Sequence, residues 1–111
     1  MQLIVKNKEK FEMIRHIVFW NLKDFAENSD KNTNANIIKT RLEALVGQID
    51  GLIRADVNLN YNPKGYDLCF FSLFESDEAL QNYQKHTLHL QVKEFVHKVI
   101  TDRVVTDCEI D

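Results

Sequence analysis

A chain of 111 residues has room for one hydrophobic core and therefore for one domain. Hydrophobic residues make up 44 % and charged residues 28 % of the chain, which are ordinary globular values that argue against disorder, and no apolar run approaches the roughly 20 residues of a membrane span. The net charge of −3 leaves no basic stripe to neutralise phosphates, so we expect neither nucleic acid nor a membrane as a partner.

The regular pattern begins at Met13, so we expect residues 1–12 to be an N-terminal extension and residues 13–111 to be the domain. The segment Met1–Lys6 has only three consecutive apolar residues, too few for a signal peptide. Cys69 and Cys108 lie within apolar, strand-like runs, and we expect both to be reduced, buried thiols. These features predict a cytoplasmic protein.

Residues 13–22 are predicted to form a strand, because they are rich in β-branched and aromatic side chains and include no breaker. The strand is apolar on both faces, which predicts a central place in a sheet that is covered on both sides. Its alternate residues His16, Val18 and Trp20 share one face.

A polar loop at residues 24–36 is predicted to lead into the first helix, with Ser29, Asp30 or Thr33 as its N-cap. Gly47 is placed to end this helix. The apolar stripe consists of Ile37, Ile38, Leu42, Leu45 and Val46. The opposite face is charged and is predicted to face solvent; it carries Lys39, Arg41 and Glu43.

Strict alternation of apolar and polar residues predicts an edge strand at residues 53–61. The side chains expected on its buried face are Ile53, Ala55, Val57, Leu59 and Tyr61. A turn at Asn62–Gly65 then leads into residues 66–74, a second run that is apolar on both faces. These two strands are predicted to form a hairpin.

Ser76 is the predicted N-cap of the second helix. The inward-facing residues of this helix are Ala79, Leu80 and Tyr83. The pattern breaks at His86, and Thr87 is the predicted N-cap of a further helix. A last strand is predicted at residues 103–110.

The order strand, helix, strand, strand, helix, strand predicts a ferredoxin-like α+β fold with a four-stranded antiparallel sheet, in the order four, one, three, two. Strands one and three are then central, in agreement with their two apolar faces. The helices of one chain cover only one face, and soluble monomers seldom expose a large apolar patch, so we expect a homodimer that packs sheet to sheet. The face left open carries Ile17, Phe19, Cys69, Phe71 and Leu73.

Five short pieces of the sequence resemble the stress-responsive dimeric α/β barrel family, often called Dabb: Met13–Trp20, Gly65–Asp67, Phe74–Ser76, the Tyr83, His86 and His89 spacing, and Arg103–Asp107. The likeness covers residues 13–110. It implies that two sheets pair into an α/β barrel. Some plant members are polyketide cyclases, and the resemblance implies proton transfer by the residues that match their histidine and tyrosine, His89 and Tyr83, with His16 and Asp107 nearby.

This topology brings four polar groups to one apolar space, and the candidate catalytic residues are His89, Tyr83, His16 and Asp107. A carboxylate beside an imidazole fixes its tautomer, and a phenol can donate a hydrogen bond to a carbonyl or to a developing enolate. We therefore expect a pocket for a small apolar or aromatic ligand, and any reaction would be cyclase-like or lyase-like acid-base chemistry without a cofactor. The expected pocket residues are Val18, Trp20, Phe70, His86 and Val105.

The alternative is a non-catalytic, stress-associated dimer in which a buried network of histidine, aspartate and tyrosine pins the second helix to the sheet. A roomy pocket would favour the first reading and a filled one the second. His86 and His89 have the spacing of a metal pair, but no acidic or cysteine ligand accompanies them in sequence, so we expect no metal. His97 is predicted to be exposed to solvent.

Overall fold

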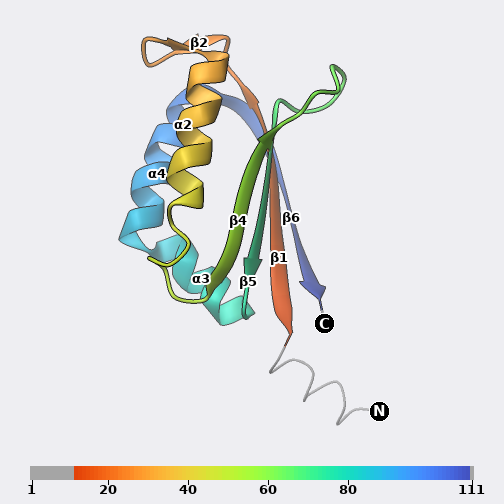
Figure 1. Cartoon of the computed structure of the whole chain (residues 1–111), viewed down its shortest axis with the longest axis vertical. Coiled ribbons are helices and arrows are strands. Elements are labelled where there is room, and N and C mark those ends of the chain that lie inside the picture. Colours follow the sequence, from red (N-terminus) through yellow and green to blue (C-terminus); the bar gives the residue numbers. More distant parts are fainter. Residues whose placement is uncertain (1–11, 111) are drawn as a thin grey trace.

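A computed structural model describes residues 12–110 of the chain, so the expected extension lies outside the described residues except for Glu12. Four strands form an antiparallel sheet in the order β4-β5-β1-β6. Their bounds are Met13–Leu22 for β1, Leu52–Leu59 for β4, Leu68–Phe74 for β5 and Ile100–Ile110 for β6. The helices of the described residues are α2 (Lys31–Glu43), α3 (Asp77–Lys85) and α4 (Thr87–Val99), and they lie on one side of the sheet (Figure 1). The predicted ferredoxin-like topology and strand order are confirmed.

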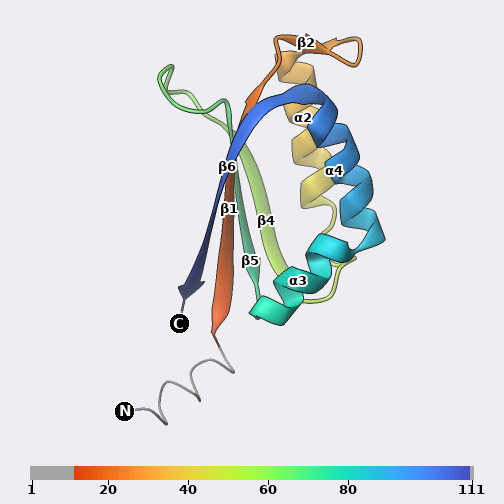
Figure 2. The ribbon, with the colours of Figure 1, turned by 180° about the vertical axis from the view of Figure 1, so that it is seen from behind.

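Strand β1 pairs with β5 on one side and with β6 on the other, which places it inside the sheet as predicted. The side chains that it buries beneath the helices are Ile14, His16, Val18, Trp20 and Leu22. Residues of the opposite parity face the other side of the sheet, where Phe71 of β5 is 45 % exposed. No helix among the described residues covers that side (Figure 2).

Both cysteines lie on this open face, where Cys69 is the strand partner of Phe19 and Cys108 that of Arg15. Both are free thiols, but Cys69 is only half-buried and Cys108 is exposed. The prediction of two buried thiols is therefore not met within a single chain, because no described helix covers the face on which they lie.

Strand β4 departs from the predicted alternation because of a β-bulge. Its register against β5 shifts between Leu52 and Arg54, so that Ile53 is an extra residue and is 46 % exposed. The prediction was also wrong at the other end of the strand, where Leu59 is 52 % and Tyr61 is 99 % exposed. Tyr61 follows the end of β4 and has left the layer that the helices cover.

Helix α2 begins after Asp30, one of the three predicted caps, whose carboxylate accepts a hydrogen bond of 2.8 Å from the N–H of Thr33. A hairpin of two short strands, β2 (Phe25–Ala26) and β3 (Ser29–Asp30), replaces the expected loop. Its turn residues Glu27 and Asn28 both have a positive φ, as a two-residue hairpin turn requires. The helix ends at Glu43, before the Val46 of the predicted stripe, which is 39 % exposed.

The face of α2 that was predicted to face solvent instead protects the sheet edge. Glu43 accepts a hydrogen bond of 2.9 Å from the N–H of Val57, and Lys39 donates one of 2.7 Å to the carbonyl of Val57. Lys39 and Glu43 also form an ion pair of 2.8 Å. Because β4 is an edge strand, these side chains occupy backbone groups that would otherwise be open to another strand.

Helices α3 and α4 meet at His86. Ser76 caps α3 as predicted, accepting a hydrogen bond of 3.1 Å from the N–H of Ala79. The cap of α4 is His86 and not the predicted Thr87, since Nδ1 of His86 accepts a hydrogen bond of 3.1 Å from the N–H of Leu88. The extended backbone of His86 ends one helix, and its ring meets the free N–H groups that begin the next.

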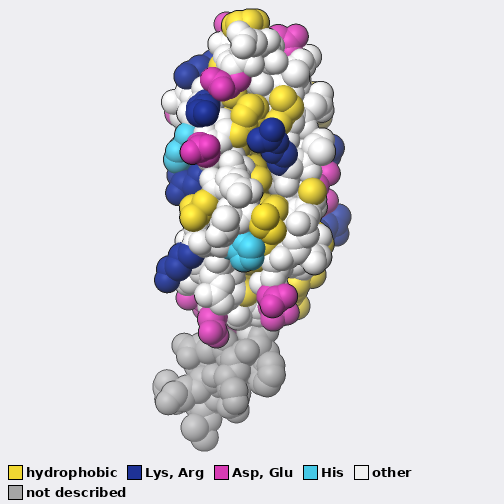
Figure 3. All heavy atoms as spheres, turned by 90° about the vertical axis from the view of Figure 1, so that its left-hand side faces the viewer, with side chains coloured by type: hydrophobic (Ala, Val, Ile, Leu, Met, Phe, Trp, Pro, Cys, Tyr) yellow, Lys and Arg dark blue, Asp and Glu magenta, His cyan; other side chains and the backbone are white. Residues whose placement is uncertain are grey.

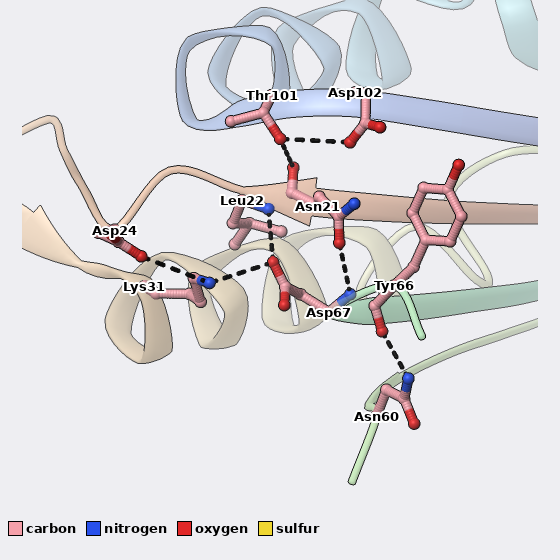
Figure 4. A network of polar contacts seen from close by, with 9 residues as sticks. All are labelled: Asn21, Leu22, Asp24, Lys31, Asn60, Tyr66, Asp67, Thr101 and Asp102. Atoms are coloured by element: carbon pink, nitrogen blue, oxygen red, sulfur yellow. Dashed lines mark hydrogen bonds and ion pairs between the residues drawn. The ribbon is translucent and has the colours of Figure 1, made fainter. Parts of the chain in front are cut away.

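A network of polar contacts fixes the end of the sheet next to α2 (Figure 4). The carboxylate of Asp67 accepts a hydrogen bond of 2.8 Å from the N–H of Leu22 and pairs with Lys31 at 3.3 Å. The side chain of Asn21 accepts from the N–H of Asp67 at 3.0 Å, and the hydroxyl of Thr101 donates to the carbonyl of Asn21 at 3.2 Å. These contacts connect β1, β5, β6 and α2.

None of the helices within residues 12–110 has the length and apolar character needed to cross a membrane.

Candidate functional site

A cavity of about 230 Å³ lies between the sheet and the helices. Its apolar wall is drawn from β1, β5, α2 and α4 and consists of Val18, Trp20, Leu42, Phe70 and Val96. Its polar lining consists of His16, Tyr83, Gln84, His89, Lys93, His97 and Arg103. A small concave space with an apolar wall and a few convergent polar groups has the composition of a ligand site.

Three of the residues expected in the pocket, Val18, Trp20 and Phe70, line this cavity. The rings of Trp20 and Phe70 are stacked, with centroids 5.8 Å apart. His86 and Val105 do not line it. The ring of His86 is engaged in capping α4, and Val105 packs from β6 against the edge of the core.

His16 and Asp107 are direct partners in the register of β1 and β6, although they are 91 residues apart in sequence. Nδ1 of His16 lies 2.5 Å from Oδ1 of Asp107. His16 is buried and lines the cavity, whereas Asp107 stands behind it with 44 % of its side chain exposed. The carboxylate occupies Nδ1, so Nε2 is the nitrogen that remains for a ligand.

The rings of Tyr83 and His89 contact each other from different helices, with centroids 4.2 Å apart and an angle of 34° between the ring planes. Six residues of continuous helix would place two side chains about 240° apart, on different faces. The break at His86 removes that constraint and turns both rings toward the cavity. Tyr83 is 1 % exposed and its ring packs against the ring of Phe74 at 4.9 Å.

Burial is the largest cause of the shifted pKa values of Tyr83 and His89. It raises the pKa of the Tyr83 phenol and lowers the pKa of His89 to about 4. The charges of Lys93, His16 and Arg103 lower the pKa of His89 further, and the backbone of Gln84 offsets only part of the effect. Both side chains are therefore neutral at pH 7.

Within residues 12–110, neither ring has a hydrogen-bond partner of good geometry. Nδ1 of His89 is buried and has no hydrogen bond of good geometry, although the backbone of Gln84 lies near enough to raise the pKa of the ring as a weak hydrogen bond would. The hydroxyl of Tyr83 likewise forms no hydrogen bond with the described residues. Buried polar groups are normally satisfied, so the imperfectly bonded His89 ring and the Tyr83 hydroxyl are groups of the lining that a bound molecule could engage.

Four polar residues of the lining were not expected in the pocket from the sequence: Gln84, Lys93, His97 and Arg103. The sequence does contain a pattern that could have indicated some of these residues. His89, Lys93 and His97 follow one another at intervals of four residues, so they share one face of α4. Arg103 has the strand parity of Asp107. His97 is exposed, as predicted, and it also stands at the cavity.

No group of three histidine, cysteine, aspartate or glutamate side chains is placed to hold a metal ion in the described part of the chain. The polar groups of the cavity are instead suited to hydrogen bonding and proton transfer. Tyr83 offers a donor, and His89 and His16 offer imidazole nitrogens.

Solved structures with the same fold cover most of this chain. A dimeric protein of unknown function with a ferredoxin-like fold from Bacteroides fragilis is 26 % identical, with a TM-score of 0.79 over 88 % of this chain and 96 % of its own. A Dabb family protein from Mesorhizobium loti is 22 % identical, with a TM-score of 0.70 over 87 % and 95 %. A hydroxynitrile lyase from Passiflora edulis is 18 % identical, with a TM-score of 0.76 over 90 % and 94 %.

No curated protein sequence matches this chain. The model of the Dabb family, described as the stress responsive A/B barrel domain, matches residues 14–110. This range includes every strand of the main sheet almost to its ends and all three helices. The chain therefore belongs to the stress responsive A/B barrel domain family.

Proposed function

We propose that the protein binds a small, largely apolar ligand in the cavity beside α4 and carries out acid-base chemistry on it with Tyr83 and His89. The observation that carries this proposal is a cavity of about 230 Å³ that His16, Tyr83 and His89 line together, with Nδ1 of His89 left buried without a well-formed hydrogen bond. A purely structural network would satisfy its own hydrogen bonds. Leaving a buried donor or acceptor unsatisfied costs about 1 to 3 kcal/mol, which a bound ligand would recover.

The protonation states fit a reaction at the carbon next to a carbonyl. Neutral His89 has a ring nitrogen that can accept a proton from this carbon, and the Tyr83 hydroxyl can donate a hydrogen bond to the oxygen that becomes an enolate. Because the pKa of His89 is about 4, it is a weak base, and the enolate needs the hydrogen bond that Tyr83 donates. Nε2 of His16 is an acceptor when Nδ1–H donates to Asp107, so it can receive a hydrogen bond from a hydroxyl group of the ligand. His89 would then return the proton to the product, so that no cofactor is consumed.

Cyclisation of a polyketide-like chain is one reaction of this class, and the resemblance to plant polyketide cyclases points to it. The neighbour from Passiflora edulis is described as a lyase, which makes a lyase the other reaction type to test. At 18 % identity, the likeness to this neighbour supports the fold alone. An experiment must therefore decide between cyclisation and a lyase reaction.

We propose that the working unit is a homodimer formed through the open sheet face. This face exposes 45 % of Phe71 and 42 % of Val104, and the ring of Phe19 stacks there on that of Tyr66 at 6.1 Å. Aromatic side chains without cover from their own chain favour a second apolar layer. The neighbour from Bacteroides fragilis is described as dimeric. The free cysteines are consistent with a reducing compartment, and we place the protein in the cytoplasm.

A second candidate function is a non-catalytic, stress-associated dimer, favoured by the packing around Tyr83. This residue is almost fully buried and packs edge-on against Phe74, and the His16–Asp107 pair closes without any ligand. In this reading the cluster holds α3 against the sheet.

Two variants separate the candidates. His89→Leu removes the imperfectly bonded nitrogen and Tyr83→Phe removes the unbonded hydroxyl, while Tyr66→Phe on the open face is the control. Thermal unfolding is measured for each, alone and with a small library of polyketide-like and fatty-acyl compounds.

If the cluster serves a ligand, the melting temperatures of the two cluster variants stay unchanged or rise, and compounds that stabilise the wild type and Tyr66→Phe no longer stabilise them. A loss of several degrees in His89→Leu or Tyr83→Phe, with no compound stabilising the wild type, would reject the ligand-binding function in favour of the structural one.

A further inference from the structure

Three basic side chains line the cavity at its solvent-exposed side: Lys93, His97 and Arg103. Lys93 and His97 share one face of α4 with His89, being four residues apart. Arg103 belongs to β6 and is the direct strand partner of Trp20, whose ring forms part of the wall. Helix α4 leads directly into β6, which turns back in the opposite direction (Figure 2). Each of these two elements therefore contributes a cation to the cavity.

Neither Lys93 nor Arg103 forms an ion pair with any residue that the structure describes. Other basic residues do, namely Lys31, Lys39 and Arg54. Two acidic residues of β6 lie near Arg103 in sequence, but neither pairs with it. Asp107 is hydrogen-bonded to His16. Asp102 is adjacent to Arg103 along the strand, so its side chain faces the other side of the sheet.

The presence of Lys93 and Arg103 beside the cavity does not reflect a generally basic protein surface. The whole chain has a net charge of −3. On the helical side of the molecule, basic and acidic side chains are interspersed around apolar ones (Figure 3). Other Lys and Arg side chains of the described residues also lack an ion pair, but among them only Lys93 and Arg103 line the cavity.

The two cations also act on the interior of the site. Lys93 and Arg103 both disfavour a positive charge on His89, which shows that their fields reach the ring. The same fields would stabilise a negative group placed between them. A guanidinium presents paired N–H donors that match the two oxygens of a carboxylate, and an ammonium adds a second charge.

We infer that the ligand of this cavity is a small apolar carboxylic acid, bound as the carboxylate between Lys93 and Arg103 with its apolar part against Trp20 and Phe70. The inference rests on the proposed ligand-binding function and specifies the ligand class. The cavity volume of about 230 Å³ lies below the roughly 300 to 1,000 Å³ of most ligand pockets, which limits the ligand to a single ring or a short branched chain.

Arg103 and His16 stand at different ends of the wall that β1 contributes to the cavity. Arg103 is paired with Trp20, whereas Asp107 is paired with His16, four residues earlier on β1. Four residues of strand span about 13 Å. A ligand held by its carboxylate at Arg103 can thus extend along β1 toward His16, where a carbonyl or hydroxyl group would meet the polar side chains of the lining.

Three probes of similar size and different charge test the inference: 4-propylbenzoate, the neutral 4-propylbenzamide and 4-propylphenyl phosphate. Their dissociation constants are measured by titration calorimetry at low ionic strength. The proteins are the wild type, Lys93→Gln, Arg103→Gln and the double variant. Lys98→Gln is the control, since Lys98 is an exposed residue of α4 that does not line the cavity.

We expect the wild type and Lys98→Gln to bind the benzoate about tenfold more tightly than the benzamide, and the double variant to lose this preference with little change for the benzamide. Equal binding of benzoate and benzamide by the wild type, or a preference that survives in the double variant, would overturn the carboxylate assignment and leave the proposed ligand binding intact. Tighter binding of the phosphate would overturn it in favour of a phosphorylated ligand. If no probe binds and the compound library also gives no stabilisation, both the inference and the proposed function fail.

Discussion

The ring of His16 and the carboxylate of Asp107 face each other across β1 and β6, with Nδ1 and Oδ1 2.5 Å apart. The carboxylate thereby determines which nitrogen of His16 is offered to the cavity. We predict that Asp107→Ala lowers ligand affinity or turnover about tenfold, because the ring can then turn and take either tautomer. The free energy of unfolding should fall by only about 1 kcal/mol, since the carboxylate is partly solvated.

The matched control for this prediction is Asp102→Ala, which removes a carboxylate from the same strand but from the opposite side of the sheet. Affinity is measured with the best compound from the library, and stability by urea unfolding. Equal affinities in Asp107→Ala and in the wild type would show that Asp107 does not orient the ring.

The lowered pKa of His89 predicts an acid-sensitive stability. The folded protein holds this ring neutral down to about pH 4, whereas the unfolded chain protonates it near pH 6.5. Between these values the unfolded state binds more protons, so stability falls as the pH decreases from about 6.5 to 4. We expect a loss of about 1 to 2 kcal/mol, a value reduced because the ring is partly exposed.

The difference in unfolding free energy between the wild type and His89→Leu isolates this effect from the titration of the carboxylates. The advantage of His89→Leu over the wild type should grow as the pH falls from 7 to 4.5. A constant difference across this range would mean that His89 is not protonated preferentially in the unfolded chain.

The open sheet face predicts how the protein assembles. Phe71→Asp would bury an unpaired charge between two sheets, so this variant should sediment as a monomer while the wild type sediments as a dimer at micromolar concentration. Val46→Asp is the control, because Val46 is 39 % exposed, close to the 45 % of Phe71, but lies beyond the end of α2. A monomeric wild type would contradict the proposed interface.

The exposed thiol of Cys108 reports on the same interface. If a second copy covers the open face, a thiol reagent should label Cys108 slowly in the wild type and rapidly in Phe71→Asp. Similar, rapid labelling of both proteins would place Cys108 outside the interface.

Gly51 and Gly47 have similar backbone conformations in different surroundings, with φ of +86° and +89°. A Cβ atom at Gly51 would lie 2.4 Å from Cβ of Ala79 at the start of α3, whereas one at Gly47 would meet nothing within 4 Å. We predict that Gly47→Ala costs about 1 kcal/mol, the price of a left-handed conformation, and that Gly51→Ala costs about 2 to 4 kcal/mol. Urea unfolding measures both, and equal losses would show that α3 moves aside without cost.

Much of the fold follows from local patterns in the sequence. Two runs that are apolar on both faces identify β1 and β5 as the central strands, because only a doubly covered strand can bury both sets of side chains. Ser76 and the following acids mark the start of α3 through the needs of its free N–H groups. The likeness of the family motifs likewise depends only on residue types and spacing.

The bulge at Ile53 and the role of Lys39 and Glu43 could not be read in this way. A bulge is a mismatch between two strands, and its position is expressed in the register of β4 against β5 and not in the alternation of β4 alone. Lys39 and Glu43 look like solvent-facing charges until the edge of β4 lies beside them.

For the candidate site, too, some features follow from the sequence and others only from the tertiary structure. Sequence alone determined which residue types are present and that His16 and Asp107 belong to neighbouring strands facing the helices. Only the tertiary structure decided that these two residues are direct partners, that the break at His86 brings Tyr83 into contact with His89, and that Lys93 and Arg103 share one cavity. The reason is physical: periodicity specifies the face of an element to which a side chain belongs, whereas contacts between distant elements depend on strand register, on helix crossing and on the space that packing leaves unfilled.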